Sequence, residues 1–195
     1  MIKKMMKISY LLLLLTAFFI SCEDRNYVPK PPTYLKIDLP ERSYDIYKTT
    51  DECDFTFNKP NYFKVKPVKQ SSCNKDIILE GLNGTLHLSV IDMDTTLGMY
   101  INHANDKVGE HKIKATAIID TTIIRKEDRV FGTFFELQGN VASPFQFYVT
   151  DSTDRFFSGV VYFNSRPNYD SIKPTLNFVK KDLIEFMNTI NWENR

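Results

Sequence analysis

The chain has few of the residues that build metal sites and phosphate loops. Its 195 residues include three cysteines, three histidines and seven glycines. It contains no C-x-x-C or H-x-x-x-H motif, and His87, His103 and His111 lie in different segments of the chain. The glycines are dispersed and form no phosphate-binding loop. We therefore expect neither a metal site nor a cofactor.

The chain also lacks an excess of either charge. It has 25 Lys and Arg against 24 Asp and Glu, so its formal net charge is +1. No basic surplus is available to neutralise a phosphate backbone, which argues against a nucleic-acid partner. The composition, 43% apolar and 13% aromatic, is that of an ordinary globular domain and not of a disordered or polytopic membrane protein.

The N-terminus has the pattern of an export signal. Lys3, Lys4 and Lys7 precede an uncharged apolar run over residues 8–20, which is shorter than the ~20 residues that span a bilayer. The residues Phe19-Ile20-Ser21-Cys22 then resemble a bacterial lipoprotein box. We predict a signal peptide over residues 1–21, with Cys22 as the acylated, palmitate-bearing first residue. The alternative is a conventional signal with an incidental cysteine.

A polar spacer follows the cysteine and ends Pro29-Lys30-Pro31-Pro32. Proline-rich segments favour a stiff polyproline II conformation of about 3.1 Å per residue, so ten residues span roughly 30 Å. Without residues 1–21 the chain keeps 22 Lys and Arg against 24 acids, which makes it mildly acidic. We predict an anchor and spacer over residues 22–32 and one domain over residues 33–195.

Two cysteines remain in the predicted domain, Cys53 and Cys73. Export places them in an oxidising compartment, where an even pair usually forms a disulfide. Two free thiols are the alternative, because the sequence does not show whether the Cα atoms lie close enough to be bridged.

Hydrophobic periodicity predicts both strands and helices in the domain. Alternation and β-rich runs predict strands, and three- and four-residue steps predict helices. The C-terminal helix is expected to begin at Asp170 or Ser171, with Pro174 in its first turn. The expected elements are a strand or hairpin over 54–68 around a turn at 58–61, a strand over 84–93, a helix over 97–108 capped by Asp94 or Thr95, strands over 113–124, 129–138, 144–150 and 156–163, and the C-terminal helix.

This order of elements predicts an α+β fold, in which helices cover an antiparallel sheet as a two-layer sandwich. The arrangement is similar to the Mog1/PsbP-like fold. Both phases of the strands at 144–150 and 156–163 are apolar or aromatic. We therefore expect a helix on one face of these strands and a partner on the other.

The segment Thr150-Asp151-Ser152-Thr153-Asp154 places a hydroxyl nucleophile beside carboxylates. A serine nucleophile also needs a base held by a third group, and no sequence rule brings a histidine to this segment. Asp and Ser side chains that bond their own backbone are typical of a turn between strands. The turn is the stronger interpretation, and we predict no enzymatic activity.

A longer motif block carries a family resemblance. It consists of Gln146-Phe147-Tyr148-Val149-Thr150-Asp151-Ser152-Thr153, Gly159-Val160-Val161-Tyr162-Phe163 and Pro167-Asn168-Tyr169-Asp170-Ser171-Ile172-x-Pro174. The Tyr-Val-Pro-Lys-Pro spacer from Tyr27 and the closing Asn191-Trp192 add to it. These residues resemble the GldD family of gliding-motility lipoproteins. Arg155-Phe156 stands where the family is expected to have His-Phe, which argues against a histidine-based role at that position.

The resemblance implies a non-enzymatic lipoprotein of the cell envelope that is required for gliding and linked to type IX secretion. It would be anchored by lipid, face the periplasm and contact other gliding and secretion proteins. The polar residues that we predict to make these contacts are Gln146, Asp151, Ser152, Arg155, Arg166, Asn168 and Asp170.

Two other classes remain open at this point. One is a periplasmic solute- or glycan-binding lipoprotein with a cleft lined by Tyr100, Tyr148 and Tyr162. The other is a hydrolase that acts through Ser152.

Overall fold

A computed structural model describes residues 38–49, 53–69, 71–165 and 167–193. These residues belong to one compact unit that spans residues 33–195. The predicted signal peptide, Cys22 and the predicted spacer lie outside the described residues.

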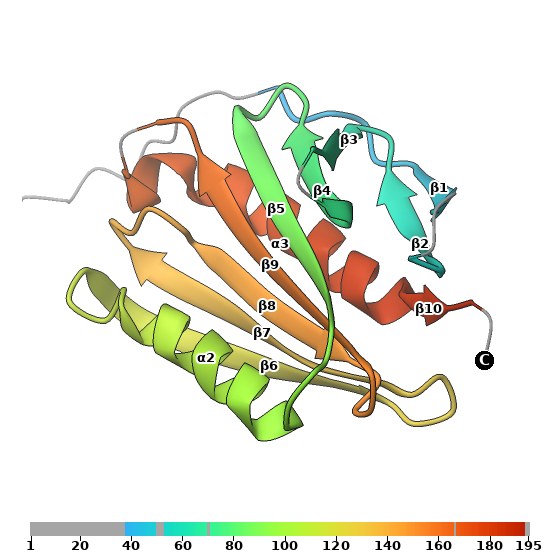
Figure 1. Cartoon of the computed structure of the whole chain (residues 1–195). Helices are drawn as coiled ribbons and strands as arrows, with labels where there is room; N and C mark the ends of the chain where they lie inside the picture. The colour runs from blue at the N-terminus through green and yellow to red at the C-terminus, as the bar shows by residue number, and fades with distance from the viewer. Residues whose placement is uncertain (1–37, 50–52, 70, 166, 194–195) are drawn as a thin grey trace, which may run out of the picture. The chain divides into compact units, whose positions relative to one another are not determined.

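A seven-stranded antiparallel sheet forms the centre of the domain, in the order β3-β4-β5-β9-β8-β7-β6 (Figure 1). Strands β6 to β9 follow one another as a meander, and β5, β4 and β3 extend the sheet beyond β9. The meander was predicted from alternation and is confirmed. The bounds of these strands are β3 Phe63–Val68, β4 Ser71–Leu79, β5 Gly84–Asp92, β6 Ala115–Arg125, β7 Val130–Gly139, β8 Phe145–Thr150 and β9 Arg155–Phe163.

A second, small sheet has the order β1-β2-β10, with β1 over Tyr44–Lys48, β2 over Phe55–Pro60 and β10 over Asn191–Trp192. Residues 54–68, predicted as a strand or hairpin, do form strands, but β2 and β3 are not paired as a hairpin, because β2 belongs to the small sheet and β3 to the large one. The turn between them is also later than predicted, at Asn61 and Tyr62. The Asn61 N–H donates to the Ser43 carbonyl at 2.9 Å, which holds this turn against the start of β1.

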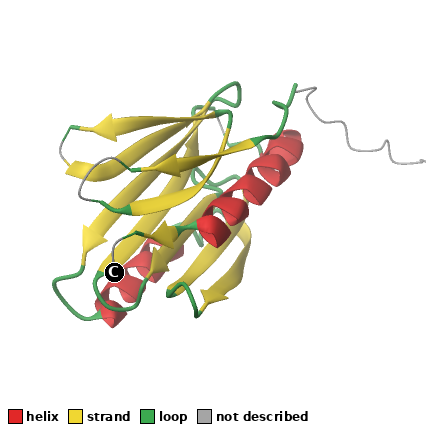
Figure 2. Cartoon of the chain, turned by 90° about the vertical axis from the view of Figure 1, so that its right-hand side faces the viewer, coloured by secondary structure: helices red, strands yellow, loops and turns green. Residues whose placement is uncertain are grey.

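The C-terminal helix α3, Tyr169–Thr189, packs on one face of the large sheet, and we call this the α3 face. It runs behind the strands in Figure 1 and diagonally alongside them in the turned view of Figure 2. Its N-cap is Asn168, whose side chain accepts a hydrogen bond from the Ser171 N–H. Pro174 lies in the second turn, one turn later than predicted. The helix buries the predicted face: Leu176, Val179, Leu183, Phe186 and Met187.

The other helix, α2 over Leu97–Gly109, lies on the opposite face, which we call the α2 face (Figure 1). On β7, Phe134 packs into the α3-face core, while its neighbour Phe135 packs with Val108 of α2. The N-cap of α2 is Thr96 and not the predicted Asp94 or Thr95. The α+β class is confirmed, and helices on both faces give three layers where two were predicted.

A buried carboxylate ties the start of the domain to α3. Asp182 is fully buried and accepts hydrogen bonds from the hydroxyls of Tyr44 and Tyr62 at 2.5 and 2.6 Å and from the Arg42 guanidinium at 2.7 Å. Burial, followed by the hydrogen bond to Asp182, raises the pKa of Tyr44 and of Tyr62. Both tyrosines therefore stay neutral and keep donating in the folded protein at pH values where they would ionise in the unfolded chain.

Cys53 and Cys73 form a disulfide, with 5.4 Å between their Cα atoms. The predicted bond is therefore present, and the alternative of two free thiols is not. The bond joins the residues before β2 to β4, so it covalently links the segment that enters the small sheet to a strand of the large one.

We predict that the protein loses stability above pH 10 through Tyr62. Because the pKa of Tyr62 is higher in the folded state, its neutral hydroxyl contributes fully to the free energy of unfolding below the unfolded pKa near 10. This contribution is lost as the pH rises toward the folded pKa. The free energy of unfolding should fall by about 1.4 kcal/mol per pH unit for this one residue. Urea unfolding between pH 8 and 11 measures the slope. The slope should be smaller in Tyr62→Phe, and equal slopes in the two proteins would contradict the prediction.

The disulfide closes a loop with a sequence separation of 20. Loop-closure entropy predicts that its removal costs about 3 kcal/mol. The double variant Cys53→Ser, Cys73→Ser should show this loss in denaturant unfolding. Adding a reductant should lower the stability of the unaltered protein to the same level and leave the double variant unchanged. If a reductant breaks the bond and the stability of the unaltered protein does not change, the predicted cost of removing the disulfide is wrong.

Candidate functional site

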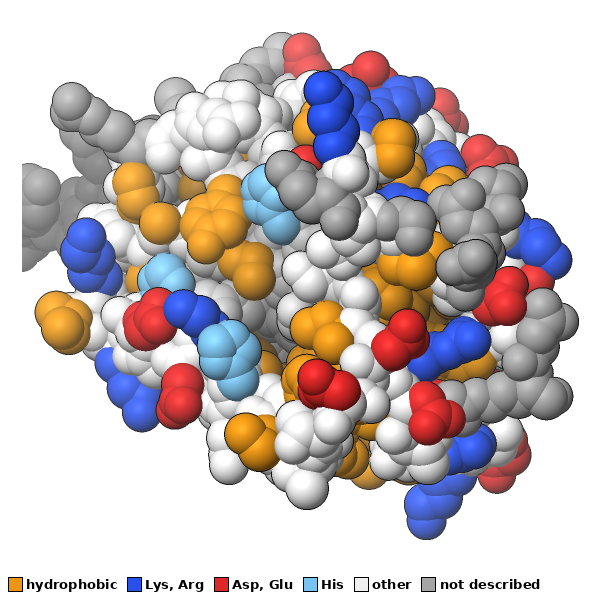
Figure 3. Space-filling model, viewed as in Figure 1, with side chains coloured by type: hydrophobic (Ala, Val, Ile, Leu, Met, Phe, Trp, Pro, Cys, Tyr) orange, Lys and Arg blue, Asp and Glu red, His pale blue; other side chains and the backbone are white. Residues whose placement is uncertain are grey.

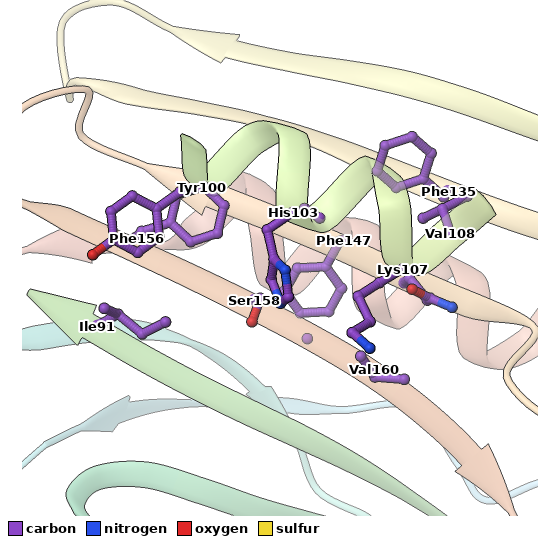
Figure 4. Close-up of a pocket in the computed structure, with 13 residues that line it drawn as sticks. Ile91, Tyr100, His103, Lys107, Val108, Phe135, Phe147, Phe156, Ser158 and Val160 are labelled. Atoms are coloured by element: carbon purple, nitrogen blue, oxygen red, sulfur yellow. The ribbon is translucent and has the colours of Figure 1, made fainter. Parts of the chain in front are cut away.

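A groove of about 220 Å³ lies between α2 and the strands β5, β9 and β8 (Figure 4). Tyr100, His103 and Lys107 line it from α2, and Ile91 lines it from β5. Most of the lining is apolar or aromatic. The other lining residues are Ala104, Val108, Phe135, Gln146, Phe147, Phe156, Ser158, Gly159 and Val160.

The groove follows from the path of α2. The helix connects β5 to β6, and these two parallel strands are separated by β9, β8 and β7. Val108 is the only residue of α2 that is buried. The helix therefore covers part of the α2 face and leaves space beside it, over β5 and β9.

The floor of the groove is backed by tight packing on the α3 face. Gly159 of β9 pairs with Phe147 of β8, and a Cβ placed on Gly159 would lie 2.1 Å from the Phe147 ring. Phe147 in turn contacts Phe186 of α3, with 5.6 Å between ring centroids. A side chain at position 159 would displace this ring, so glycine is required here for a close approach.

Gln146 is the buried polar group of the groove. Its register in β8 places it between Phe135 of β7 and Val160 of β9, which both line the groove. The residue is 5% exposed. Among the described residues none makes a hydrogen bond with its side-chain amide, whose donor and acceptor both remain available.

The rim of the groove on α2 is polar. His103 and Lys107 are exposed, and the Lys107 ammonium lies 3.0 Å from the Glu110 carboxylate one turn later. Tyr100 donates its hydroxyl proton to Asp94 at 2.6 Å, and this hydrogen bond raises the pKa of Tyr100. The Tyr100 hydroxyl is thus already hydrogen-bonded to Asp94. The Tyr100 ring lies beside the Phe156 ring, with 5.4 Å between the ring centroids.

The three tyrosines predicted for a ligand cleft do not come together. Tyr100 lines the groove, whereas Tyr148 stacks on Phe156 and lines a second hollow between α2 and β6 to β8. Tyr162 lies beside His87, with 5.8 Å between the ring centroids, and lines neither space.

The predicted partner-contact residues lie in separate places. Asp151 is fully buried, and its Oδ1 atom accepts from the N–H groups of Thr153, Asp154 and Arg155 at 2.9 to 3.0 Å. It therefore organises the turn between β8 and β9. Ser152 is exposed in this turn, and its φ of 70° is a left-handed conformation. The geometry is that of the predicted turn.

Arg155 donates to the Asp54 carbonyl at 2.9 Å and so joins β9 to the segment before β2. Asn168 and Asp170 follow the other end of β9, a strand of nine residues that spans about 26 Å. Asn168 caps α3, and Asp170 is exposed in its first turn. Arg166 lies outside the described residues, as does Cys22. The predicted polar residues thus form no single patch.

The sequence predicted a cleft between sheet and helix that contains Tyr100, and separately predicted Gln146 as a contact residue, but it did not place the two together in this groove. The lining residues come together only because α2 crosses the sheet; they include His103, Lys107, Ile91 and Val160. No local sequence pattern shows which strands the helix crosses. Within the described residues, no group of three His, Cys, Asp or Glu side chains is placed to hold a metal ion. His87 instead pairs with Asp76 at 2.7 Å.

We predict that Asp151→Ala destabilises the protein by about 2 kcal/mol, because it leaves three backbone donors without their shared acceptor. Chemical denaturation measures this loss. Ser152→Ala is the matched control, because its side chain is exposed, and should change stability by less than about 0.5 kcal/mol. Equal effects of the two substitutions would show that the carboxylate does not organise the turn.

The comparisons with known proteins concern the whole chain. The sequence model of the family described as gliding motility lipoprotein GldD matches residues 24–192. No curated protein matches the chain. None of the helices within the described parts of residues 38–193 has the length and apolar character needed to cross a bilayer. Because the match extends over most of its length, the chain belongs to the family of gliding motility lipoproteins GldD.

Proposed function

We propose that this protein is a non-enzymatic component of the gliding motility machinery, held at a membrane by lipid on Cys22, with its domain facing the periplasm and a role in type IX secretion. The observation that carries the proposal is the family match over residues 24–192, which begins two residues after Cys22.

The layout of the N-terminal sequence supports the anchor. Three lysines and an apolar run precede Cys22, and the spacer between Cys22 and residue 33 can hold the domain roughly 30 Å from a membrane surface. A domain at this distance can reach proteins that stand in the same membrane. This suits a structural component that must contact several partners.

The geometry of the polar segments supports a non-enzymatic role. In the segment 150–154 the hydroxyl of Thr150 accepts from the Ser152 N–H, and the Asp151 carboxylate accepts from three other backbone groups. These side chains satisfy the backbone of a tight turn and so have a structural task. The hydrolase alternative would need Ser152 to be activated by a base.

The groove beside α2 favours one alternative function, a periplasmic solute- or glycan-binding lipoprotein. Its unpartnered Gln146 amide and apolar lining are features of a ligand site. A ligand that binds the folded state would raise the melting temperature, by an amount that grows with the logarithm of its concentration relative to its dissociation constant. Thermal melts with candidate sugars and amino acids distinguish this function from a purely structural one.

The proposed function predicts that deleting the gene in its host abolishes both surface spreading and the normal profile of secreted proteins. Complementation by the unaltered gene should restore both. Cys22→Ala should restore neither, because the domain would no longer be held at the membrane. Ser152→Ala should restore both and serves as the matched control for expression and export.

Spreading and secretion are scored in the same strains, with immunoblots to show that each variant accumulates. Normal spreading and secretion in the deletion strain would overturn the motility function. Rescue by Cys22→Ala would overturn the lipid anchor alone. Failure of Ser152→Ala at normal protein levels would move the interpretation to the hydrolase.

A further inference from the structure

We propose that the groove beside α2 binds an extended apolar peptide segment of a partner protein, with a peptide group of that segment hydrogen-bonded to Gln146 and a carboxylate near Lys107 and His103. This inference goes beyond the proposed function, and its test rests only on the lipid anchor proposed there for Cys22.

The lining favours aliphatic side chains. Ile91, Phe156 and Val160 contribute apolar surface from the sheet, and Ala104 and Val108 contribute it from α2. Figure 3 shows hydrophobic side chains in several patches on this face of the molecule, with histidine, basic and acidic side chains around them. At about 220 Å³ the groove is smaller than the ~300–1,000 Å³ of a typical small-molecule site. It can therefore take a few side chains of a longer partner.

The Gln146 amide favours a peptide over other classes of ligand. Its side-chain amide offers one acceptor and two donors, which match the N–H and C=O groups of a peptide in extended conformation. Gln146 is 5% exposed and its amide atoms reach the open groove, so a peptide group that enters the groove can form hydrogen bonds with them there. An acyl chain would bury this amide without a hydrogen bond. An oligosaccharide would need more polar partners than the lining supplies.

The charge of the rim favours an acidic group on the ligand. No Asp or Glu lines the groove, whereas Lys107 and His103 do. Lys107 also contacts Glu110, but this pair is exposed on the helix, where an ion pair contributes little and a ligand carboxylate can compete. A carboxylate beside the apolar part of the segment would thus meet a cation at the rim.

The test uses the full mature, lipid-bearing protein in nanodiscs. The probe is the peptide N-acetyl-leucyl-photoleucyl-aspartate with a free C-terminus, which is cross-linked by light and located by mass spectrometry. We expect cross-links at Ile91, Val108 or Val160, with saturable dependence on peptide concentration. Empty nanodiscs and protein that has been unfolded and alkylated give the background.

Three substitutions separate binding from folding. Gln146→Leu should raise the dissociation constant of the peptide about tenfold, because the hydrogen bonds to the amide are lost. Gln138→Leu is the matched control on the same sheet: its side chain bonds Glu136, outside the groove, so peptide binding should be unchanged. Lys107→Glu lies on the exposed face of α2 and should weaken binding of the acidic peptide several-fold, while binding of the uncharged analogue N-acetyl-leucyl-photoleucyl-asparagine amide should be unaffected.

Cross-links scattered over the surface, or unchanged by both Gln146→Leu and Lys107→Glu, would overturn the proposal. Displacement of the probe by laurate or by chitotriose at concentrations where unlabelled peptide has no effect would also overturn it, and would assign the groove to an acyl chain or a sugar. Because the readout is binding by the purified protein, its failure leaves the motility experiment untouched.

Discussion

The Phe186 ring of α3 contacts a ring from each of the two sheets, and the architecture depends on this contact. Phe57 of the small sheet lies 4.5 Å from it and Phe147 of the large sheet lies 5.6 Å from it, measured between ring centroids. Aromatic pairs at such distances add to the stabilisation from the area that they bury. Because Phe147 also covers Gly159, the same contact fixes the spacing of β8 and β9 under the groove. The packing of the core therefore extends through Phe147 to the floor of the groove.

The buried charged groups of the domain hold segments together. Asp182 joins α3 to the residues at the start of the domain, and Asp151 closes the turn between β8 and β9. Glu136 of β7 pairs with Lys180 of α3 at 2.5 Å. Each carboxylate has several donors or a cation, as a buried charge requires. These carboxylates are therefore engaged in holding the fold together, whereas Gln146 is a buried polar side chain that lines the groove.

Local periodicity and β-rich runs were enough to predict β5 to β9, α2 and α3, because each of these segments carries apolar residues at the spacing of a strand or a helix. They failed for β4, whose residues Ser71 to Asp76 are mostly polar and which forms a strand because β3 and β5 pair with it on both sides. They also failed to separate β2 from β3. Alternation assigns a strand to a sheet only when the partner is known, and the partners of β2, which are β1 and β10, come from opposite ends of the domain.

The candidate site was predictable in part for the same reason. Gln146 was among the polar residues predicted to contact a partner, and the apolar phases of β8 and β9 predicted a helix on one face of these strands and a partner on the other. The disulfide followed from the number of cysteines and their compartment. The groove did not follow, because its walls come from β5, β8, β9 and α2, and only the strand order places them side by side.

The widths of the elements explain why the groove lies on the α2 face. Seven strands at about 4.8 Å spacing give a sheet roughly 30 Å wide, and a single helix with its side chains covers about 10 Å of it. On the α3 face, the 21 residues of α3 and the rings of the small sheet together cover the core. On the α2 face the 13 residues of α2 act alone, and hollows remain along both sides of the helix. The α2 face therefore offers a partner apolar surface on both sides of the helix.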